Sequence, residues 1–158
     1  MNALQVIELF AGHGPDGNPV VERLSVRVNE DDSCQLVKSP AFIKGIASGD
    51  TIKLEQGTQD FTLVKRSGNL AIRVISRDDI GEVAEQLTPA LEKLGGELDI
   101  ETPRMLVYSI HVSCGFTEIE AILNKTVSDS VIWLYGNVYD PKDGQTPLNW
   151  WQEILQPE

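Results

Sequence analysis

The chain has few residues of the kinds that hold metals or redox cofactors. Only two cysteines, Cys34 and Cys114, and two histidines, His13 and His111, occur among its 158 residues. The cysteines lie far apart and form no C-x-x-C pair, which excludes a zinc ribbon and a thioredoxin-like site. The turn over residues 140–144 lacks the spacing of an EF-hand. We therefore expect no metal and no cofactor, and reduced thiols that are buried or half-buried.

Long apolar runs are also absent. The longest run is the five residues Val131–Tyr135, whereas a membrane span needs about 18 or more. No lysine or arginine precedes Arg23, and the N-terminus alternates in polarity instead of forming an apolar segment, which argues against a secretory signal. These absences predict a cytoplasmic protein that does not enter membranes.

Basic residues are fewer than acidic residues in this chain. The chain has 13 lysines and arginines against 24 aspartates and glutamates, a net charge of -11 at pH 7. Residues 70–158 contain six basic and fifteen acidic residues, so this part alone carries -9. Such a field repels nucleic acid and anionic lipid. It indicates either solubility alone or recognition of a basic protein partner.

The hydrophobic pattern of residues 70–138 predicts strand, helix, strand, strand, helix, strand, the order of a ferredoxin-like or split βαβ sheet. The first helix has Asp78 or Asp79 as its expected cap, and Pro89 is expected to kink it or to break it with Thr88 capping a second short helix. Its apolar stripe consists of Ile80, Val83, Ala84, Leu87, Leu91 and Leu94.

The second predicted helix begins with a recognisable signal. Thr117 and Glu120 have the spacing of a capping box, and Phe116 is placed to pack on Ala121 as a hydrophobic staple. The apolar run Val131–Tyr135 is the expected closing strand.

The first 69 residues contain short alternating runs separated by turns. Strands are predicted over residues 4–10 and 20–28, and a further pair is predicted to turn at Gly57. This pattern favours a small, mostly antiparallel barrel or curled sheet. The chain is thus expected to be an α+β protein with a β-rich subdomain (1–69), a ferredoxin-like βαββαβ subdomain (70–140) and a tryptophan-containing C-terminal tail (141–158).

Three short motifs follow one another along the chain. They are residues 40–50 (PAFIKGIASGD, with the pattern PxFxxGxAxGD), residues 67–69 (SGN) leading into residues 72–74 (IRV), and residues 94–96 (LGG). In this order the sequence resembles an uncharacterised bacterial family known only as a domain of unknown function, over about residues 4–140. The resemblance implies a two-part α+β fold and no chemistry. A histidine often stands in that family where this chain has Asn69, so no role of that histidine transfers here.

Arg73 and His111 are candidate ligand or interface residues. If residues 70–76 and 105–112 form the two central strands, as the split βαβ order requires, both side chains share one face of the sheet. The N-terminal half is expected to pack on that face, which makes both of them interface residues. A ligand lying on the face is the alternative.

Acidic residues and tryptophans supply two candidate surfaces for a partner. Glu97, Asp99 and Glu101 alternate along a predicted strand and are expected to share a solvated face at a sheet edge. Trp150 and Trp151 lie among aliphatic residues in the tail and are costly to leave in water. Docking on the chain's own domain is expected for the tail, with a partner or dimer contact as the alternative.

Candidate catalytic residues are few. His13 lies near Asp16 in a loop rich in glycine, where a polar turn residue is expected and a general base is the alternative. Cys114 precedes the second predicted helix, a position at which a thiol can become reactive.

None of these residues forms a catalytic or binding signature. The leading expectation is therefore a non-enzymatic, acidic protein-binding or regulatory module that recognises a basic protein. A small-ligand sensor that uses the cleft between the subdomains is the alternative. A third hypothesis is an enzyme that uses His13, His111 or Cys114.

Overall fold

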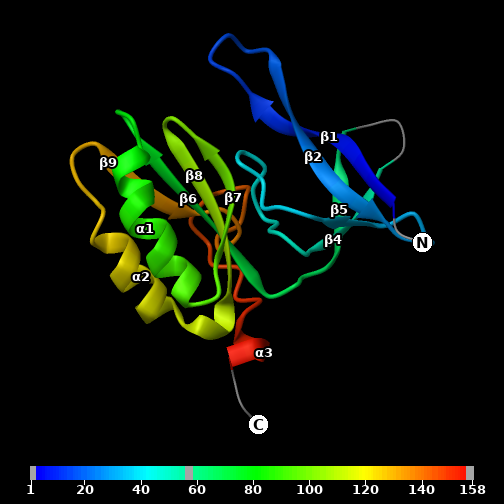
Figure 1. Cartoon of the computed structure of the whole chain (residues 1–158). Helices are drawn as coiled ribbons and strands as arrows, with labels where there is room; N and C mark the ends of the chain where they lie inside the picture. Colours follow the sequence, from blue (N-terminus) through cyan, green and yellow to red (C-terminus); the bar gives the residue numbers. More distant parts are fainter. Residues whose placement is uncertain (1–2, 56–58, 156–158) are drawn as a thin grey trace.

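The computed structural model describes residues 3–55 and 59–155, and it contains two antiparallel sheets, one of them covered by helices (Figure 1). The α+β class predicted from the sequence is confirmed. Within the described residues, no helix is long and apolar enough to cross a membrane.

The first sheet has five strands in chain order. They are β1 (Ala3–His13), β2 (Pro19–Val28), β3 (Cys34–Leu36), β4 (Thr51–Leu54) and β5 (Phe61–Lys65). Alternate residues of β2 are buried, as expected for a strand with one face on a core. That core consists of Leu9, Leu24, Val26, Cys34, Leu36, Ile43, Ile46 and Ile52.

The first sheet does not close into a barrel. Among the described residues, β1 and β5 are not paired as strands. The N–H of Phe10 donates to the carbonyl of Gln59 at 3.0 Å, which brings the end of β1 near the start of β5. Of the two predicted forms, the barrel is therefore wrong. The turn expected at Gly57 lies outside the described residues.

The second sheet has the strand order β7-β8-β6-β9. Its strands are β6 (Asn69–Ser76), β7 (Glu97–Thr102), β8 (Met105–His111) and β9 (Val131–Tyr135), with helices α1 (Gly81–Lys93) and α2 (Phe116–Asn124) between them and a short 3-10 turn η1 (Val112–Cys114) before α2. The strands β6 and β8 are the central neighbours, as predicted, and β9 is an edge strand.

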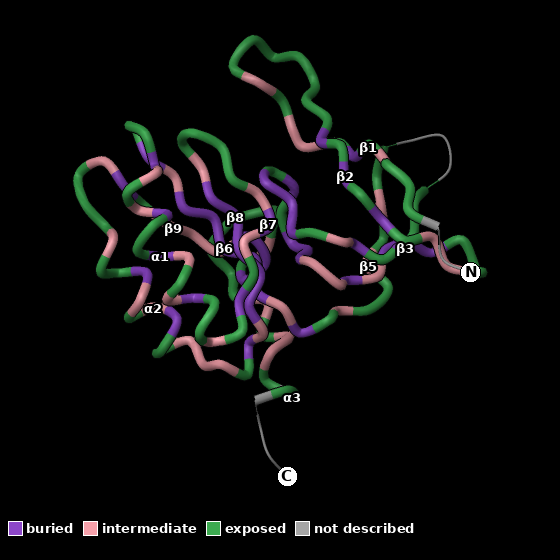
Figure 2. Tube along the Cα trace, viewed as in Figure 1, coloured by how far each residue is buried: buried purple, intermediate pink, exposed green. Residues whose placement is uncertain are grey.

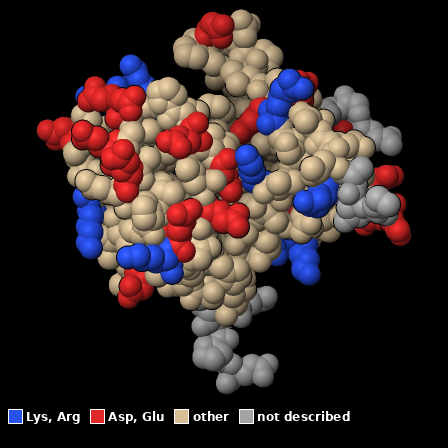
Figure 3. Space-filling model, viewed as in Figure 1, with Lys and Arg blue, Asp and Glu red and all other residues tan. Residues whose placement is uncertain are grey.

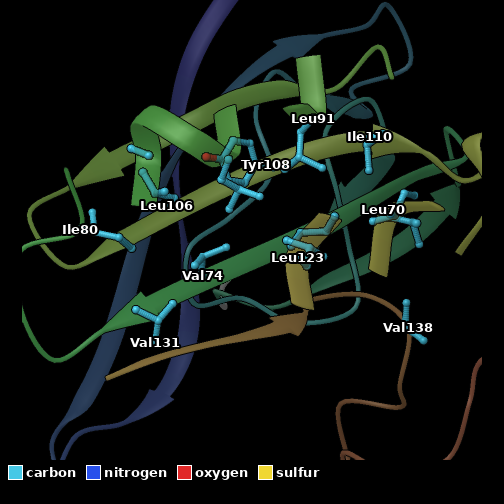
Figure 4. Packing of buried hydrophobic residues seen from close by; sticks show 14 of the residues in the cluster. Leu70, Val74, Ile80, Leu91, Leu106, Tyr108, Ile110, Leu123, Val131 and Val138 are labelled. Atoms are coloured by element: carbon cyan, nitrogen blue, oxygen red, sulfur yellow. The ribbon is translucent and has the colours of Figure 1, made fainter. Parts of the chain in front are cut away.

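Helices α1 and α2 cover one face of this sheet (Figure 1). Leu70, Val74, Leu106 and Tyr108 point from the strands toward these helices (Figure 4). The central strands are buried along most of their length, whereas the tip of the β1–β2 hairpin is exposed (Figure 2). The largest core of the protein therefore lies between the second sheet and its two helices.

Helix α1 differs from its prediction at two points. Its N-cap is Ile80 with no side-chain cap, so the expected cap at Asp78 or Asp79 is wrong, although the carboxylate of Asp79 accepts a hydrogen bond from the N–H of Gly81 at 2.8 Å. The helix also continues through Pro89 as a single helix, and the hydroxyl of Thr88 bonds the hydroxyl of Tyr108 at 2.6 Å instead of capping a new helix. The predicted break is therefore wrong. The helix ends before two glycines, where Gly95 has a φ of 92° and the N–H of Gly96 donates to the carbonyl of Leu91.

The predicted capping box of α2 is wrong. The helix begins at Phe116 after Gly115, so Thr117 lies inside it, and no side chain caps its N-terminus. The carboxylate of Glu120 instead accepts a hydrogen bond from the hydroxyl of Tyr135 at 2.8 Å. Phe116 packs edge-on against the rings of Tyr135 and Trp151.

Candidate ligand-binding site

The loop over residues 37–50 lies between the two sheets, and it contains the first of the three sequence motifs (Figure 1, cyan). The buried carboxylate of Glu22, on β2, accepts hydrogen bonds from three consecutive backbone N–H groups of this loop. These belong to Ala41 at 2.6 Å and to Phe42 and Ile43 at 2.9 Å each. The N–H groups thus form an anion-binding concavity that is filled by the protein's own carboxylate.

Arg73 holds the same loop from the opposite side. It extends from β6, is 4% exposed, and donates to the carbonyls of Ile43 and Phe42. Burial lowers the pKa of the Arg73 guanidinium, and the nearby negative charge of Glu22 acts against that shift. Both buried charges therefore depend on the backbone of this loop for their hydrogen bonds. The prediction that Arg73 is an interface residue is consistent with these contacts.

Asp99 forms a second connection between the loop and the second sheet. Its carboxylate accepts hydrogen bonds from the N–H of Ser39 at 2.8 Å and from the hydroxyl of Ser109. The two hydroxyls of Ser39 and Ser109 are 2.7 Å apart. Burial raises the pKa of the Asp99 carboxyl, and the hydrogen bond from Ser109 opposes this shift.

The expectation that Glu97, Asp99 and Glu101 share a solvated face is wrong. The register between β7 and β8 shifts between Leu98 and Ile100, so Asp99 is an additional residue in its strand and is only 7% exposed. Glu97 pairs with Ser109 and Glu101 pairs with Leu106, which places these two exposed glutamates on opposite faces of the sheet.

The loop also carries Lys44 to the edge of the second sheet. The N–H of Gly45 donates to the carbonyl of Gly136 at 2.8 Å, and Arg66 donates to the carbonyl of Gly45 at 2.9 Å. These bonds fix the backbone beside Lys44 against the end of β9. The side chain of Lys44 is exposed, and within the described residues its ammonium group has no hydrogen-bond or carboxylate partner.

A pocket of about 430 Å³ lies where Lys44 meets β9. We call it the junction pocket, and its principal lining side chains are Lys44, Glu120, Trp133, Tyr135, Tyr139 and Asp140. A neighbouring hollow of about 440 Å³ shares Lys44 and is lined by three phenylalanines, but no second charged side chain lines it. Of these two hollows, the junction pocket is the one that combines aromatic walls with charges of both signs.

Hydrogen bonds fix the aromatic wall of the junction pocket. The indole N–H of Trp133 donates to Asn124 of α2 at 2.9 Å, and the Trp133 and Tyr135 rings meet edge to face with centroids 5.0 Å apart. Burial raises the pKa of the Tyr135 hydroxyl, as does the hydrogen bond to the Glu120 carboxylate, so Tyr135 remains a neutral donor. These contacts fix the orientation of both rings in the wall.

The structure separates most of the residues that the sequence singled out. His13 is exposed near the tip of the β1–β2 hairpin, where its ring packs against Phe10. His111 shares a sheet face with Arg73, as predicted from the register, but its ring nitrogen bonds the hydroxyl of Ser113 at 2.7 Å. Cys114 is half-buried. None of these three side chains lines the junction pocket.

Trp150 and Trp151 pack on the chain's own second core. The indole N–H of Trp150 donates to the carbonyl of Asn137 at 2.9 Å, and the guanidinium of Arg66 lies 5.3 Å from its ring centre. Trp151 contacts Phe116 edge-on. The described part of the tail that carries them includes the short helix α3 (Gln152–Leu155).

The sequence did not single out the residues of the junction pocket. Trp133 and Tyr135 were included in an apolar closing strand, although their alternation on an edge strand and their polar tips mark a half-exposed face. Lys44 lies in the first motif, but its meeting with β9 depends on contacts between distant segments. Among the described residues, no three His, Cys, Asp or Glu side chains are grouped as metal ligands would be.

Comparison with known proteins gives the fold and no activity. The family model described as a domain of unknown function (DUF4265) matches residues 22–134. The solved structure titled "Novel crystal structure of a hypothetical protein from Neisseria gonorrhoeae" is similar, with a TM-score of 0.66 and 18% sequence identity, over 86% of this chain and 94% of that one. No curated protein matches the chain.

Proposed function

The chain belongs to the DUF4265 family, whose function is unknown, and we propose that this member is a non-enzymatic binding module that holds a small ligand in the junction pocket. The observation that carries the proposal is the pocket itself. Its volume is within the range of about 300–1,000 Å³ of small-molecule sites, and its walls combine aromatic rings with a few polar groups.

The position of the junction pocket supports a sensing role. Lys44 comes from the loop between the sheets, Tyr135 from β9, and Asp140 from the segment after β9. A ligand that touches all three would join parts of the chain that are distant in sequence. It would stabilise the folded state in proportion to its affinity, because only the folded chain assembles the pocket.

A site-specific binding assay tests the proposal. We would screen a library of small metabolites by ¹H–¹⁵N NMR and follow the indole N–H signal of Trp133, assigned with Trp133→Phe. A true ligand shifts this signal, leaves that of Trp150 unchanged, and loses affinity in Tyr139→Ala. Val127→Ala, a truncation of an exposed apolar residue outside the pocket, is the matched control. A library that leaves the Trp133 signal unmoved contradicts the proposal.

The arrangement of the second sheet supports the finer description of the fold. We propose that residues 70–140 are a ferredoxin-like subdomain, because the order β7-β8-β6-β9 with two helices on one face is that of a split βαβ pair. We also propose a cytoplasmic location, which the two unpaired cysteines favour.

Recognition of a basic protein is the second candidate function. Acidic side chains gather over the helical part of the molecule (Figure 3). The exposed members Glu82, Glu85 and Glu92 lie on α1, and Glu101 faces the same side from β7. Their field would speed the approach of a cationic partner, and salt would reduce the effect.

Charge reversal tests this second candidate. A partner is first identified by capture at low salt. Its association with a variant of this protein that combines Glu82→Lys, Glu85→Lys and Glu101→Lys should be slower than with the wild type. Three reversals in the first sheet's exposed turns, at Asp16, Glu30 and Asp32, serve as the control of equal charge. If both triple variants associate equally fast, the acidic surface of the helical part has no specific role.

A further inference from the structure

The charged side chains that line the junction pocket are only partly hydrogen-bonded. Glu120 uses one carboxylate oxygen to accept the Tyr135 hydroxyl, and Asp140 uses one to accept the N–H of Lys142 at 2.9 Å. The second oxygen of each carboxylate has no hydrogen-bond partner among the described residues, and neither has the ammonium group of Lys44. The pocket therefore presents one free cation and two half-free carboxylates to whatever enters it.

These charges do not satisfy one another. Lys44 lines the same pocket as Glu120 and Asp140, yet it forms no ion pair with either of them. The ammonium group and the two carboxylates therefore line one pocket while lying beyond ion-pair distance of one another.

The junction pocket also has an aromatic wall. Trp133, Tyr135 and Tyr139 supply aromatic surface, and Trp133 and Tyr135 are held in place by hydrogen bonds to α2. A rigid aromatic wall binds an apolar or aromatic group at a low cost in conformational entropy.

We propose that the ligand of the junction pocket is a zwitterionic amino acid with a large apolar side chain. Its carboxylate would bind the ammonium group of Lys44, its ammonium group would bind the free oxygens of Glu120 and Asp140, and its side chain would lie on the aromatic wall. A ligand with a single charge would leave one of the two polar sides of the pocket unpaired, at a cost in affinity. This inference rests on the proposed function and specifies the chemical class of the ligand.

Isothermal titration with three probes tests the ligand class. L-phenylalanine carries both charges, phenylpropionate lacks the ammonium group, and phenethylamine lacks the carboxylate. We expect each single-charge probe to bind at least about tenfold more weakly than L-phenylalanine, the usual effect of losing one charge-assisted contact. Equal binding of all three probes, or no binding of L-phenylalanine, L-leucine, L-methionine and L-tryptophan, overturns the ligand class.

Two variants assign the charges to their partners. Lys44→Met should weaken L-phenylalanine about tenfold and leave phenethylamine unchanged, and Glu120→Gln should weaken L-phenylalanine and leave phenylpropionate unchanged. Lys53→Met, at an exposed lysine of β4, is the control for loss of a positive charge. Lys44→Met with unchanged affinity for L-phenylalanine also overturns the inference.

The two proposals fail in different ways. If the amino acids do not bind but another compound shifts the Trp133 indole signal, the ligand class is wrong and the proposed function stands. If neither the amino acids nor the wider library shifts that signal, both are wrong.

Discussion

The guanidinium of Arg73 lies directly against the backbone of Gly136. A Cβ atom added at Gly136 would be 3.2 Å from Nε of Arg73 and 3.2 Å from Cβ of Ala71. Gly136 directly follows β9, and its carbonyl accepts the hydrogen bond that holds Gly45 beside the pocket. The absence of a side chain at this one position thus allows a buried arginine to reach the loop between the sheets.

Gly136→Ala should therefore destabilise the protein by about 1–3 kcal/mol, the usual cost of overpacking a buried site. The measurement is the free energy of unfolding from urea melts. A double-mutant cycle with Arg73→Ala checks the cause, because the cost of Gly136→Ala should shrink once the guanidinium is gone. Strictly additive losses would show that contact with Arg73 is not responsible.

Asp99 should make stability depend on pH. Burial raises its pKa above the ordinary value of 3.8. In a window that starts near 3.8 and ends above the raised value, the folded state binds more protons than the unfolded one, so the free energy of unfolding falls as pH rises. Asp99→Asn removes this contribution. The free energy of unfolding of Asp99→Asn minus that of the wild type should rise with pH across the window and then stay constant.

The test compares urea melts of Asp99→Asn and Glu97→Gln from about pH 3 to about pH 7. Burial also raises the pKa of Asp50, but Asp50 is present in every variant and cancels in the difference. Glu97 is exposed on the same strand and its negative charge also raises the pKa of Asp99, so Glu97→Gln should reduce the pH dependence without abolishing it. A difference for Asp99→Asn that does not change with pH would contradict the assigned titration.

The strand β7 should respond unequally to charge reversal. Glu97→Lys and Glu101→Lys place a new charge in water and should change the melting temperature little. Asp99→Lys buries a cation among the hydrogen-bond donors of Ser39 and Ser109 and should cost at least about 3 kcal/mol or prevent folding. Circular dichroism melts separate these outcomes, and equal effects at all three positions would contradict the shifted register.

Helix α1 should show the asymmetry of a half-buried helix. Leu87 and Leu91 are 1% and 0% exposed, so replacing either with alanine should cost about 2–4 kcal/mol. Glu85 is exposed on the same helix, and Glu85→Ala should cost little. Small, equal losses at the three positions in denaturant melts would be incompatible with the packing of α1 on the sheet.

The two thiols should both be free and should differ in reaction rate. Cys34 is buried in the first core and Cys114 is half-buried. Titration with a thiol reagent under denaturing conditions should count two free thiols in unreduced protein. In the folded protein, Cys114 should react before Cys34, which needs an opening of its core. Single serine variants assign the two phases.

The parts of the fold that could be predicted from the sequence are those set by local pattern. The alternation in β2 and the stripe of α1 reflect which face is buried, and Gly95 marks the end of α1 because its φ of 92° suits glycine. These features depend on neighbours in the chain. Their positions were therefore predictable to within a few residues.

The errors occur where a distant segment decides the local structure. The carboxylate of Asp99 faces inward because Ser39, sixty residues away, donates to it. Glu120 leaves its expected capping role because Tyr135, fifteen residues away, offers a buried hydroxyl. The junction pocket could not be predicted for the same reason, since Lys44 and Trp133 meet only in the folded chain. Single-sequence patterns carry no information on such pairings.

The loop over residues 37–50 has a consequence for the integrity of the chain. Its backbone N–H groups donate to Glu22 of the first sheet, its carbonyls accept from Arg73 of the second sheet, and the N–H of Ser39 donates to Asp99 of the second sheet. A cut near residue 69 would leave the buried charges of Arg73 and Asp99 on the second fragment without their partners in the loop, although each fragment keeps an apolar core of its own. The two halves are therefore expected to unfold in one cooperative transition, and neither is suited to separate expression.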